Sequence, residues 1–174
     1  MDYRTYIRDV PDFPKPGIMF RDICPLLAHP PAVRSMLFAF ESEWTGKIDA
    51  IVALDARGFL IGMPLAVQMG LPFAPIRKAG KLPGETIATG YGLEYGTDTV
   101  EIQVGAFAKG SRVLVIDDVL ATGGTAAAAC ELLYNIGCKV AGCAFLIELA
   151  ELGGRKKLTG EVIQSLVVYE PVAA

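Results

Sequence analysis

Residues 113–125 read Val113-Leu-Val-Ile-Asp-Asp-Val-Leu-Ala-Thr-Gly-Gly-Thr125, and no other stretch says as much about the fold. The first four residues are all apolar, as in a strand that is covered on both faces of a parallel sheet. Two carboxylates and a glycine-containing turn follow, and an alanine-rich helical segment comes next. This order predicts the strand–loop–helix unit of an open α/β sheet, in which ligands bind at the carboxyl ends of the strands.

The polar half of this stretch also indicates a chemistry. Asp117 and Asp118 would repel each other at a strand end unless a cation or several hydroxyl groups lay beside them. The glycines at 123 and 124 let the backbone approach an anion, and the N-terminus of the next helix adds free amides. The stretch therefore offers acceptors for sugar hydroxyls and donors for a phosphate. A capped helix after a tight turn is the plainer interpretation, and a Walker A loop is excluded because no Gly-Lys-Ser/Thr occurs.

Similar patterns extend along the chain. Two more apolar runs, Ala50–Leu54 and Val140–Ile147, are predicted strands of the same sheet, and Thr99–Val104 alternates like a half-exposed strand. Pro30-Pro31 suits a helix start. Apolar residues at helical spacing then predict an amphipathic helix, and they are Val33, Met36, Leu37, Phe40 and Trp44. We expect an α/β fold with a central, mostly parallel sheet flanked by helices.

Three segments are less regular. The first ten residues place Tyr3, Tyr6, Ile7 and Val10 on one side of a helix that Pro11 would end. Residues 58–76 carry no charge, but their three prolines and three glycines favour a short buried helix, a turn and a buried strand over a membrane span. Residues 78–98 have many glycines and little periodicity, which is typical of a functional lid.

Length and charge narrow the class of protein. With 174 residues, 52% of them apolar and 20% charged, the chain is predicted to form one domain, residues 1–174. The net charge of −3 is too mild for a dedicated nucleic-acid binder. Residues 56–84 nevertheless hold four bases and no acid, namely Arg57, Arg77, Lys78 and Lys81. This positive segment favours an anionic small ligand, although bases at this density are also common on ordinary surfaces.

Histidine and cysteine usage excludes several mechanisms. The single histidine, His29, lies beside two prolines and is expected in a solvated loop, so Ser-His-Asp and Cys-His catalysis are disfavoured. The four cysteines form no Cys-x-x-Cys pair, so zinc and thioredoxin-like chemistry are disfavoured too. Free thiols and a charged N-terminal segment without signal-peptide character predict a cytoplasmic protein.

Residues 113–125 as a whole resemble the phosphoribosyl-pyrophosphate motif of the type I phosphoribosyltransferases. Four other segments occur in an order and spacing that resemble the adenine-specific members of that family. They are Phe13-Pro-Lys-Pro-Gly-Ile-Met-Phe-Arg-Asp-Ile23, Asp55-Ala-Arg-Gly-Phe59, Arg77-Lys-Ala-Gly-Lys-Leu-Pro-Gly-Glu-Thr86 and Leu93-Glu-Tyr-Gly-Thr97. The resemblance extends from about Tyr6 to Tyr169.

The resemblance implies the fold and the reaction. The fold would be the type I phosphoribosyltransferase fold, with a small N-terminal hood (residues 1–30) and a flexible lid loop (residues 80–97). The reaction would join adenine to 5-phosphoribosyl 1-pyrophosphate (PRPP) and release AMP and pyrophosphate, with Mg²⁺ as cofactor, in purine salvage. It also implies a homodimer and no nucleic-acid or membrane partner.

The resemblance further assigns the residues that bind the donor. Those implied for the 5′-phosphate are Ala121, Thr122, Gly123, Gly124 and Thr125. Asp117 and Asp118 would face the ribose and Mg²⁺, directly or through water, so no firm protein ligand for the metal is implied. Those implied for pyrophosphate are Asp55, Ala56, Arg57, Arg77, Lys78 and Lys81. Many members have Glu where this chain has Asp55, and the Asp55–Ala56 peptide is expected to be cis.

The purine and the proton transfer complete the implied site. Met19, Phe20 and Arg21 would bind adenine, with Phe20 stacked on the ring and backbone groups at 19 and 21 reading its edge. Glu94, Tyr95 and Arg57 would act at the reaction centre, with Glu94 exchanging a proton with the purine. Two alternatives are a related enzyme that prefers hypoxanthine or xanthine and a transcription regulator that senses PRPP. The regulator is disfavoured because the chain leaves no room for a DNA-binding domain.

Overall fold

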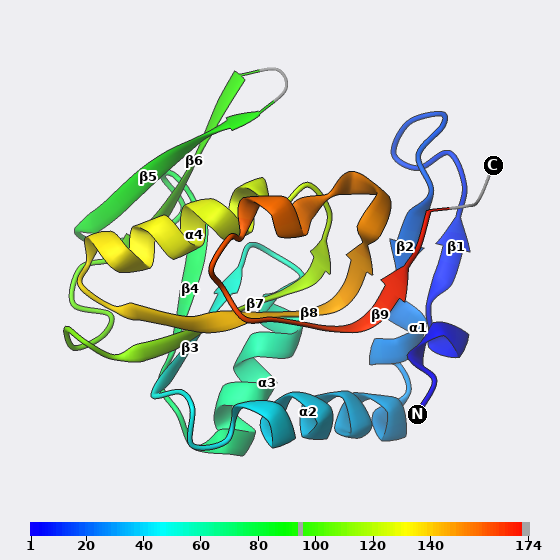
Figure 1. The fold of residues 1–174 in the computed structure, drawn as a ribbon, viewed down its shortest axis with the longest axis horizontal. Coiled ribbons are helices and arrows are strands. Elements are labelled where there is room, and N and C mark those ends of the chain that lie inside the picture. Colours follow the sequence, from blue (N-terminus) through cyan, green and yellow to red (C-terminus); the bar gives the residue numbers. More distant parts are fainter. Residues whose placement is uncertain (94–95, 172–174) are drawn as a thin grey trace.

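A computed structural model describes residues 1–93 and 96–171, and within them the chain forms a seven-stranded sheet flanked by helices (Figure 1). The strand order is β5-β6-β4-β3-β7-β8-β9. The strands are β3 (Ala50–Leu54), β4 (Phe73–Lys78), β5 (Thr86–Leu93), β6 (Gly96–Gln103), β7 (Arg112–Leu120), β8 (Lys139–Leu149) and β9 (Ile163–Tyr169). The five strands from β4 to β9 in this order run parallel, which confirms the predicted fold class.

The register of the parallel strands gathers their carboxyl ends at one edge. Val52 of β3 pairs with Ala74 of β4 on one side and with Val115 of β7 on the other. All five residues of β3 are buried, as expected for the centre of a sheet that is covered on both faces. The loops after β3, β4 and β7 therefore lie side by side, and these loops contain most of the predicted site.

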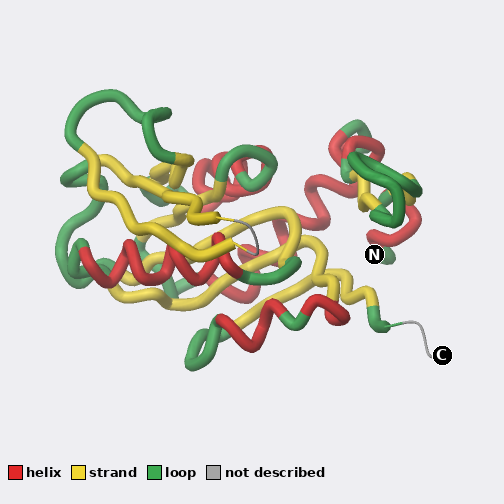
Figure 2. The backbone as a smooth tube through the Cα atoms, turned by 90° about the horizontal axis from the view of Figure 1, so that it is seen from above, coloured by secondary structure: helices red, strands yellow, loops and turns green. Residues whose placement is uncertain are grey.

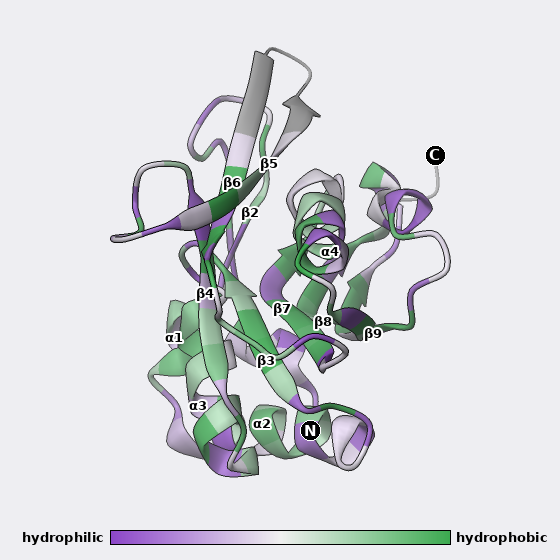
Figure 3. Ribbon diagram, turned by 90° about the vertical axis from the view of Figure 1, so that its left-hand side faces the viewer, coloured by the Kyte–Doolittle hydropathy of each residue, from purple (hydrophilic) through white to green (hydrophobic). Residues whose placement is uncertain are grey.

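Helices cover both faces of the sheet. The helices α2 (Pro30–Trp44) and α3 (Phe59–Met69) pack on one face, and α4 (Gly124–Asn135) packs on the other (Figure 3). The predicted stripe on α2 is confirmed in the core, where Phe40 and Trp44 are almost completely buried. As predicted, a short helix, a turn at Gly70 and a strand follow β3, and Gly70 ends α3 in the left-handed conformation. None of the helices in the described ranges is long and apolar enough to cross a bilayer.

The N-terminal segment differs from its prediction. The expected helix over the first ten residues is wrong: a single 3₁₀ turn (Tyr3–Tyr6) gives way to strand β1 (Arg8–Val10). β1 pairs antiparallel with β2 (Phe20–Asp22), and the short helix α1 (Cys24–Leu27) leads on to α2. Tyr3 and Ile7 are still buried, because the 3₁₀ turn and the extended chain after it bring both side chains to the core. Figure 2 shows this N-terminal part beside the main sheet.

Residues 78–98 also differ from the irregular loop that was expected. In their described part, β5 and β6 form an antiparallel hairpin that joins the main sheet through two residue pairs, Arg77 with Glu101 and Lys78 with Val100. Cross-strand hydrogen bonds fix this hairpin, so they supply the order that the weak side-chain periodicity did not reveal. Irregular chain remains between Ala79 and Glu85.

Candidate active site

Asp55 gathers the predicted pyrophosphate residues around the turn after β3. Its Oδ2 lies 3.1 Å from Arg77 Nε and 3.2 Å from Lys81 Nζ. Burial alone would raise the pKa of Asp55, but the hydrogen bonds from Lys81 and Arg77 outweigh it and the pKa is lowered. The Asp55–Ala56 peptide is cis, as expected. Lys78 is exposed at the end of β4, next to Arg77 in sequence.

Glu101 fixes the loop that carries Lys81, and the sequence did not single it out. This buried β6 carboxylate accepts hydrogen bonds from the backbone amides of Lys81 and Leu82, each at 3.0 Å, and from Thr86 Oγ1 at 3.2 Å. These bonds lower the pKa of Glu101, with the Leu82 amide as the largest cause. Its place in an alternating strand gave no sign of this role, because the loop it binds is distant in sequence.

Arg57 connects three parts of the site. Its Nε lies 2.9 Å from Oδ2 of Asp118 at the end of β7, and its guanidinium lies 4.8 Å from the ring centre of Phe20 in β2. Asp118 is almost fully buried, and its Oδ2 makes an ion pair with Arg57 without the geometry of a hydrogen bond. Burial raises the pKa of Asp118, while the positive charge of Arg57 opposes that rise. The predicted cation beside the carboxylate pair is therefore an arginine from the neighbouring loop.

Asp117 lies against the same loop. Its Oδ1 accepts the backbone amide of Asp118 at 2.9 Å, and a Cβ at Gly58 would lie 2.8 Å from that oxygen. Only glycine at 58 allows this approach, since real Cβ atoms essentially never come so close. Burial, and then the charge of Asp118, raise the pKa of Asp117 well above its ordinary value. The pair thus favours a positive or hydrogen-bonding ligand.

Residues 121–125, called the phosphate loop below, lead from β7 into α4 and line a cavity of about 80 Å³ together with Asp117. Gly123 has a φ of 75°, a left-handed conformation that suits glycine. It directly precedes α4, so the amides of the first helical turn face the loop without a capping side chain. The cavity is far smaller than a site for a whole drug-sized molecule and matches the scale of one phosphate group.

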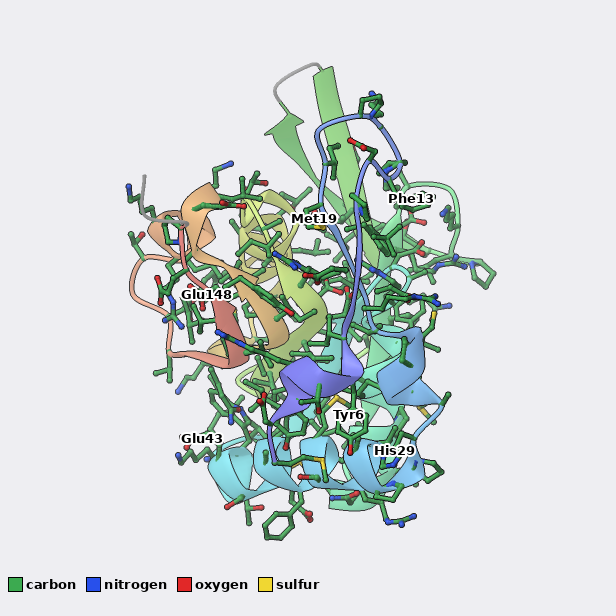
Figure 4. All side chains as sticks on the ribbon, turned by 90° about the vertical axis from the view of Figure 1, so that its right-hand side faces the viewer. Tyr6, Phe13, Met19, His29, Glu43 and Glu148 are labelled. Carbon is green, nitrogen blue, oxygen red and sulfur yellow. The ribbon has the colours of Figure 1, made fainter. Side chains whose placement is uncertain are left out.

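The hood residues predicted to bind the purine lie on β2 and the loop before it. The Phe20 ring contacts Phe13 edge to face at 5.0 Å, and Met19 is exposed. Figure 4 shows Phe13 and Met19 near the outer end of this loop. The Arg21 side chain forms an ion pair with Asp9, and its guanidinium lies 3.9 Å from the ring centre of Tyr169 on β9.

The remaining candidates are placed less directly. Glu94 and Tyr95 lie outside the described residues. His29 is a helix cap and not a free loop residue, because its Nδ1 accepts the amide of Ala32 at 3.2 Å and its ring lies 4.6 Å from that of Tyr6. In the described ranges no three His, Cys, Asp or Glu side chains gather as metal ligands.

Comparison with known proteins agrees with this geometry. A model of the phosphoribosyl transferase domain matches residues 26–167. An adenine phosphoribosyltransferase of Rhodospirillum centenum is 54% identical over 98% of this chain and 99% of its own length. The crystal structure of the Thermoanaerobacter pseudethanolicus enzyme has a TM-score of 0.93 at 47% identity, covering 97% of this chain and 98% of that one.

A further solved relative carries ligands. The adenine phosphoribosyltransferase of Saccharomyces cerevisiae, in complex with adenine and an imino-altritol bisphosphate, has a TM-score of 0.89 at 40% identity, with 95% of this chain and 96% of that one covered.

The sheet brings a small loop-lined cavity, paired carboxylates and a cationic cluster together at one edge. The model of the phosphoribosyl transferase domain spans most of the chain. The chain therefore belongs to the phosphoribosyltransferases. Relatives that are about 50% identical over nearly their full length identify the particular reaction within this class. The chain has the activity of an adenine phosphoribosyltransferase, the transfer of phosphoribose from PRPP to adenine.

The hood is anchored by a carboxylate that titrates at low pH. Asp22 Oδ2 accepts hydrogen bonds from Arg8 at 3.1 and 2.5 Å, and its Oδ1 accepts the Cys24 amide at 2.9 Å. Hydrogen bonds from the side chain and amide of Cys24, followed by that from Arg8, lower the pKa of Asp22 to about 2. An unfolded aspartate titrates near 3.9, so Asp22 stabilises the fold fully above about pH 4 and loses this effect toward pH 2.

We expect Asp22→Asn to lower the melting temperature at pH 6, because the amide makes weaker hydrogen bonds with Arg8 and Cys24 than the carboxylate does. The difference from the parent protein should shrink at pH 3, because there the unfolded parent chain binds a proton at Asp22, whereas the folded protein, with a pKa of about 2, mostly does not. Thermal unfolding followed by circular dichroism at both pH values measures this. An equal difference at pH 6 and pH 3 would show that the charge of Asp22 does not stabilise the hood.

Proposed function

We propose that PRPP binds at the edge where the carboxyl ends of the parallel strands meet, and that three adjoining surfaces there bind different parts of it. The phosphate loop binds the 5′-phosphate, Asp117 and Asp118 face the ribose hydroxyls, and the turn at 55–58 binds pyrophosphate together with Arg77, Lys78 and Lys81. The observation that carries this proposal is the order of the groups along the edge, from the phosphate-sized cavity through the paired carboxylates to the cations. Their order matches that of phosphate, ribose and pyrophosphate in the donor.

Arg77 and Lys81 are already held close together, as binding of an anion requires. Arg77 and Lys81 both contact one carboxylate oxygen of Asp55, and Arg77 Nη1 also donates to the Lys81 carbonyl at 3.3 Å. Arg77 and Lys81 are also partly exposed, so pyrophosphate oxygens can take the place of the Asp55 contacts. Arginine can bind such oxygens in pairs, whereas lysine acts as a single charge.

In the reaction, the bond between ribose C1 and the pyrophosphate oxygen breaks, and a bond from C1 to a ring nitrogen of adenine forms. The sugar becomes oxocarbenium-like between these events, as in glycoside hydrolysis. No protein nucleophile is required. The chain holds the reactants in line, stabilises the charge that develops on pyrophosphate, and excludes water. The proximity of Arg57 to both Asp118 and Phe20 places a positive charge between the donor side and the hood.

The carboxylate pair fits magnesium only together with other ligands. Two carboxylates are too few to enclose the ion, and Mg²⁺ is usually bound by one or two carboxylates together with waters and substrate phosphates. We expect Asp117 and Asp118 to hold Mg²⁺ together with oxygens of the donor. When bound, the ion neutralises charge on pyrophosphate.

Adenine is expected to lie between the hood and the sheet edge. Phe20 would stack on its face, since base–aromatic stacking contributes about 1–3 kcal/mol per base. The backbone at Met19 and Arg21 would read its edge, because a carbonyl accepts from the exocyclic amino group of adenine and is left unpaired by a 6-oxo purine. The adenine complex of the yeast relative supports this choice of base.

Incubating the protein with PRPP, Mg²⁺ and one purine at a time tests the proposal. We expect AMP from adenine, and much slower nucleotide formation from hypoxanthine or xanthine. Failure to form AMP, with binding of PRPP intact, would contradict the activity and favour a regulator that senses PRPP. Faster reaction with a 6-oxo purine would overturn the proposed readout of the purine edge.

Glu94 is the proposed proton donor and acceptor for the imidazole nitrogens of the purine. General acid–base catalysis typically contributes about 10²–10⁴-fold, so Glu94→Ala should lower kcat within that range while the Kd for PRPP changes little. Glu85→Ala, which removes an exposed carboxylate before β5, is the matched control and should leave both unchanged. Equal losses of kcat and PRPP affinity in Glu94→Ala would argue against proton transfer.

We propose that the chain acts as a homodimer in the cytoplasm. The three most exposed apolar side chains of α3 are Leu60, Met63 and Val67, and their spacing places them along one side of the helix. Figure 3 shows how apolar α3 is along its length. An apolar helix face of this kind fits burial against a second copy. Four free thiols in the described part of the chain are compatible with a reducing compartment.

Introducing a charge on this face should dissociate the dimer. Val67 is 68% exposed, so Val67→Glu costs the isolated chain little, but it would bury a carboxylate between two copies. Analytical ultracentrifugation should find a dimer for the parent protein and a monomer for Val67→Glu. Val104→Glu, at an exposed valine outside α3, should remain a dimer. A dimeric Val67→Glu variant would exclude this face as the interface.

A further inference from the structure

The phosphate loop packs against a second backbone segment, which follows β8 and which no sequence pattern connects with the loop. Gly154 is buried against the loop, and a Cβ there would lie 2.3 Å from the Ala121 carbonyl oxygen and 3.1 Å from the Gly123 amide nitrogen. A Cβ at Gly123 would in turn lie 2.5 Å from the Gly154 carbonyl oxygen. With no side chain between the two backbones, the position of residue 154 limits where the loop carbonyl and amide can lie.

A buried carboxylate holds this second segment in place. Gly154 begins a short 3₁₀ turn (Gly154–Lys157), and the next residue, Arg155, reaches back to Glu148 near the end of β8. Arg155 Nε donates to Glu148 Oε1 at 2.5 Å and Nη2 donates to Oε2 at 2.8 Å, so the pair is bidentate. Ser165 Oγ on β9 donates to the same Oε2 at 2.6 Å. Figure 4 shows Glu148 beside the turn that follows β8.

The difference in burial between Glu148 and Arg155 strengthens their ion pair. The Glu148 side chain is only 5% exposed, whereas that of Arg155 is 48% exposed. Burial would raise the pKa of Glu148, but the hydrogen bonds from Arg155 and Ser165 outweigh it and keep the carboxylate ionised. A buried carboxylate without its partner is costly, so Glu148 binds the guanidinium firmly, and the bidentate contact fixes the orientation of Arg155 as well as its distance.

We propose that the Glu148–Arg155 ion pair positions the phosphate loop for the 5′-phosphate of PRPP, acting through the backbone of Gly154. The proposal rests on the assignment of residues 121–125 to the 5′-phosphate. Glu148 and Arg155 are positioning residues, since the hydrogen bonds of their side chains join Glu148 to Arg155 and Ser165, and it is the backbone of Gly154 that contacts the loop. The loop amides must point at the phosphate before it arrives, and the contact with Gly154 keeps them there.

Arg155→Met tests the proposal, because it removes the bidentate contact at a half-exposed position. A loop that binds the donor equally in the ground and transition states affects KM more than kcat. We expect the KM for PRPP to rise about tenfold, the effect of a small misplacement of a binding group, while kcat and the KM for adenine stay within about threefold. Arg155→Lys keeps the charge without the bidentate contact and should give an intermediate KM.

Arg112→Met is the matched control. Arg112 lies at the amino end of β7, where its Nε and Nη2 contact the two oxygens of Asp49 at 3.0 and 2.7 Å, and its side chain is 45% exposed. This variant also loses a bidentate ion pair of a half-exposed arginine, here with a more exposed carboxylate, at the end of β7 opposite the phosphate loop, so the KM for PRPP should not change. Equal KM values for PRPP in Arg155→Met and the parent protein, or equal rises in Arg155→Met and Arg112→Met, would overturn the proposal.

Two more measurements separate this inference from the assignment on which it rests. Thr122→Val changes the loop itself, so an unchanged KM for PRPP in that variant would contradict the assignment of the loop to the 5′-phosphate. A raised KM in Thr122→Val without a raised KM in Arg155→Met would contradict only the positioning role. Calorimetry should show that Arg155→Met binds ribose 5-phosphate more weakly than the parent protein does and binds pyrophosphate equally well. Weaker binding of both ligands in this variant would contradict the proposal.

Discussion

Two successive carboxylates at the end of a buried strand impose the constraint on which the site depends. Asp117 and Asp118 cannot both be charged in a buried place unless positive or hydrogen-bonding groups surround them. The sheet meets part of this need, because β3 and β7 are parallel neighbours and the loop after β3 therefore brings Arg57 to Asp118. In the proposed site, ribose hydroxyls and a metal ion would meet the rest of this need, so the repulsion between the two carboxylates would favour binding of the substrate.

On the other side of the edge the charges are reversed, because a carboxylate there holds two cations together. Arg77 and Lys81 would repel each other, and Asp55 holds them together by contacting both with one carboxylate oxygen. Glu101 holds the backbone of the same loop from β6, so the loop depends on a strand of the hairpin as well as on the parallel sheet. Carboxylates thus prearrange both halves of a site whose main ligand is itself an anion, which lowers the ordering cost of binding.

Much of this could be predicted from the sequence where the signal was local. The apolar runs located β3, β7 and β8, and the helical spacing located α2. Of the residues predicted to form one site, the structure brings Arg57 to Asp118, and Arg77 and Lys81 to Asp55. The alternation over 99–104 located most of β6, but β5 and its pairing with β6 were missed, because cross-strand bonds stabilise the hairpin without a side-chain periodicity in β5. The N-terminal helix was wrong because Tyr3 and Ile7 reach the core from a 3₁₀ turn and extended chain. Tyr169, Glu101 and Glu148 could not be assigned, since their partners lie far away in sequence.

The backbone contact between Gly123 and Gly154 has a consequence for how such chains can diverge. A Cβ at either glycine would collide with the backbone segment that contains the other, so the two positions constrain each other although thirty residues of chain lie between them, and the left-handed φ of Gly123 favours glycine there as well. A side chain at either position can be tolerated only if the opposite segment moves away, which would alter the loop that it touches. Substitutions in the turn after β8 are therefore restricted by the loop that follows β7.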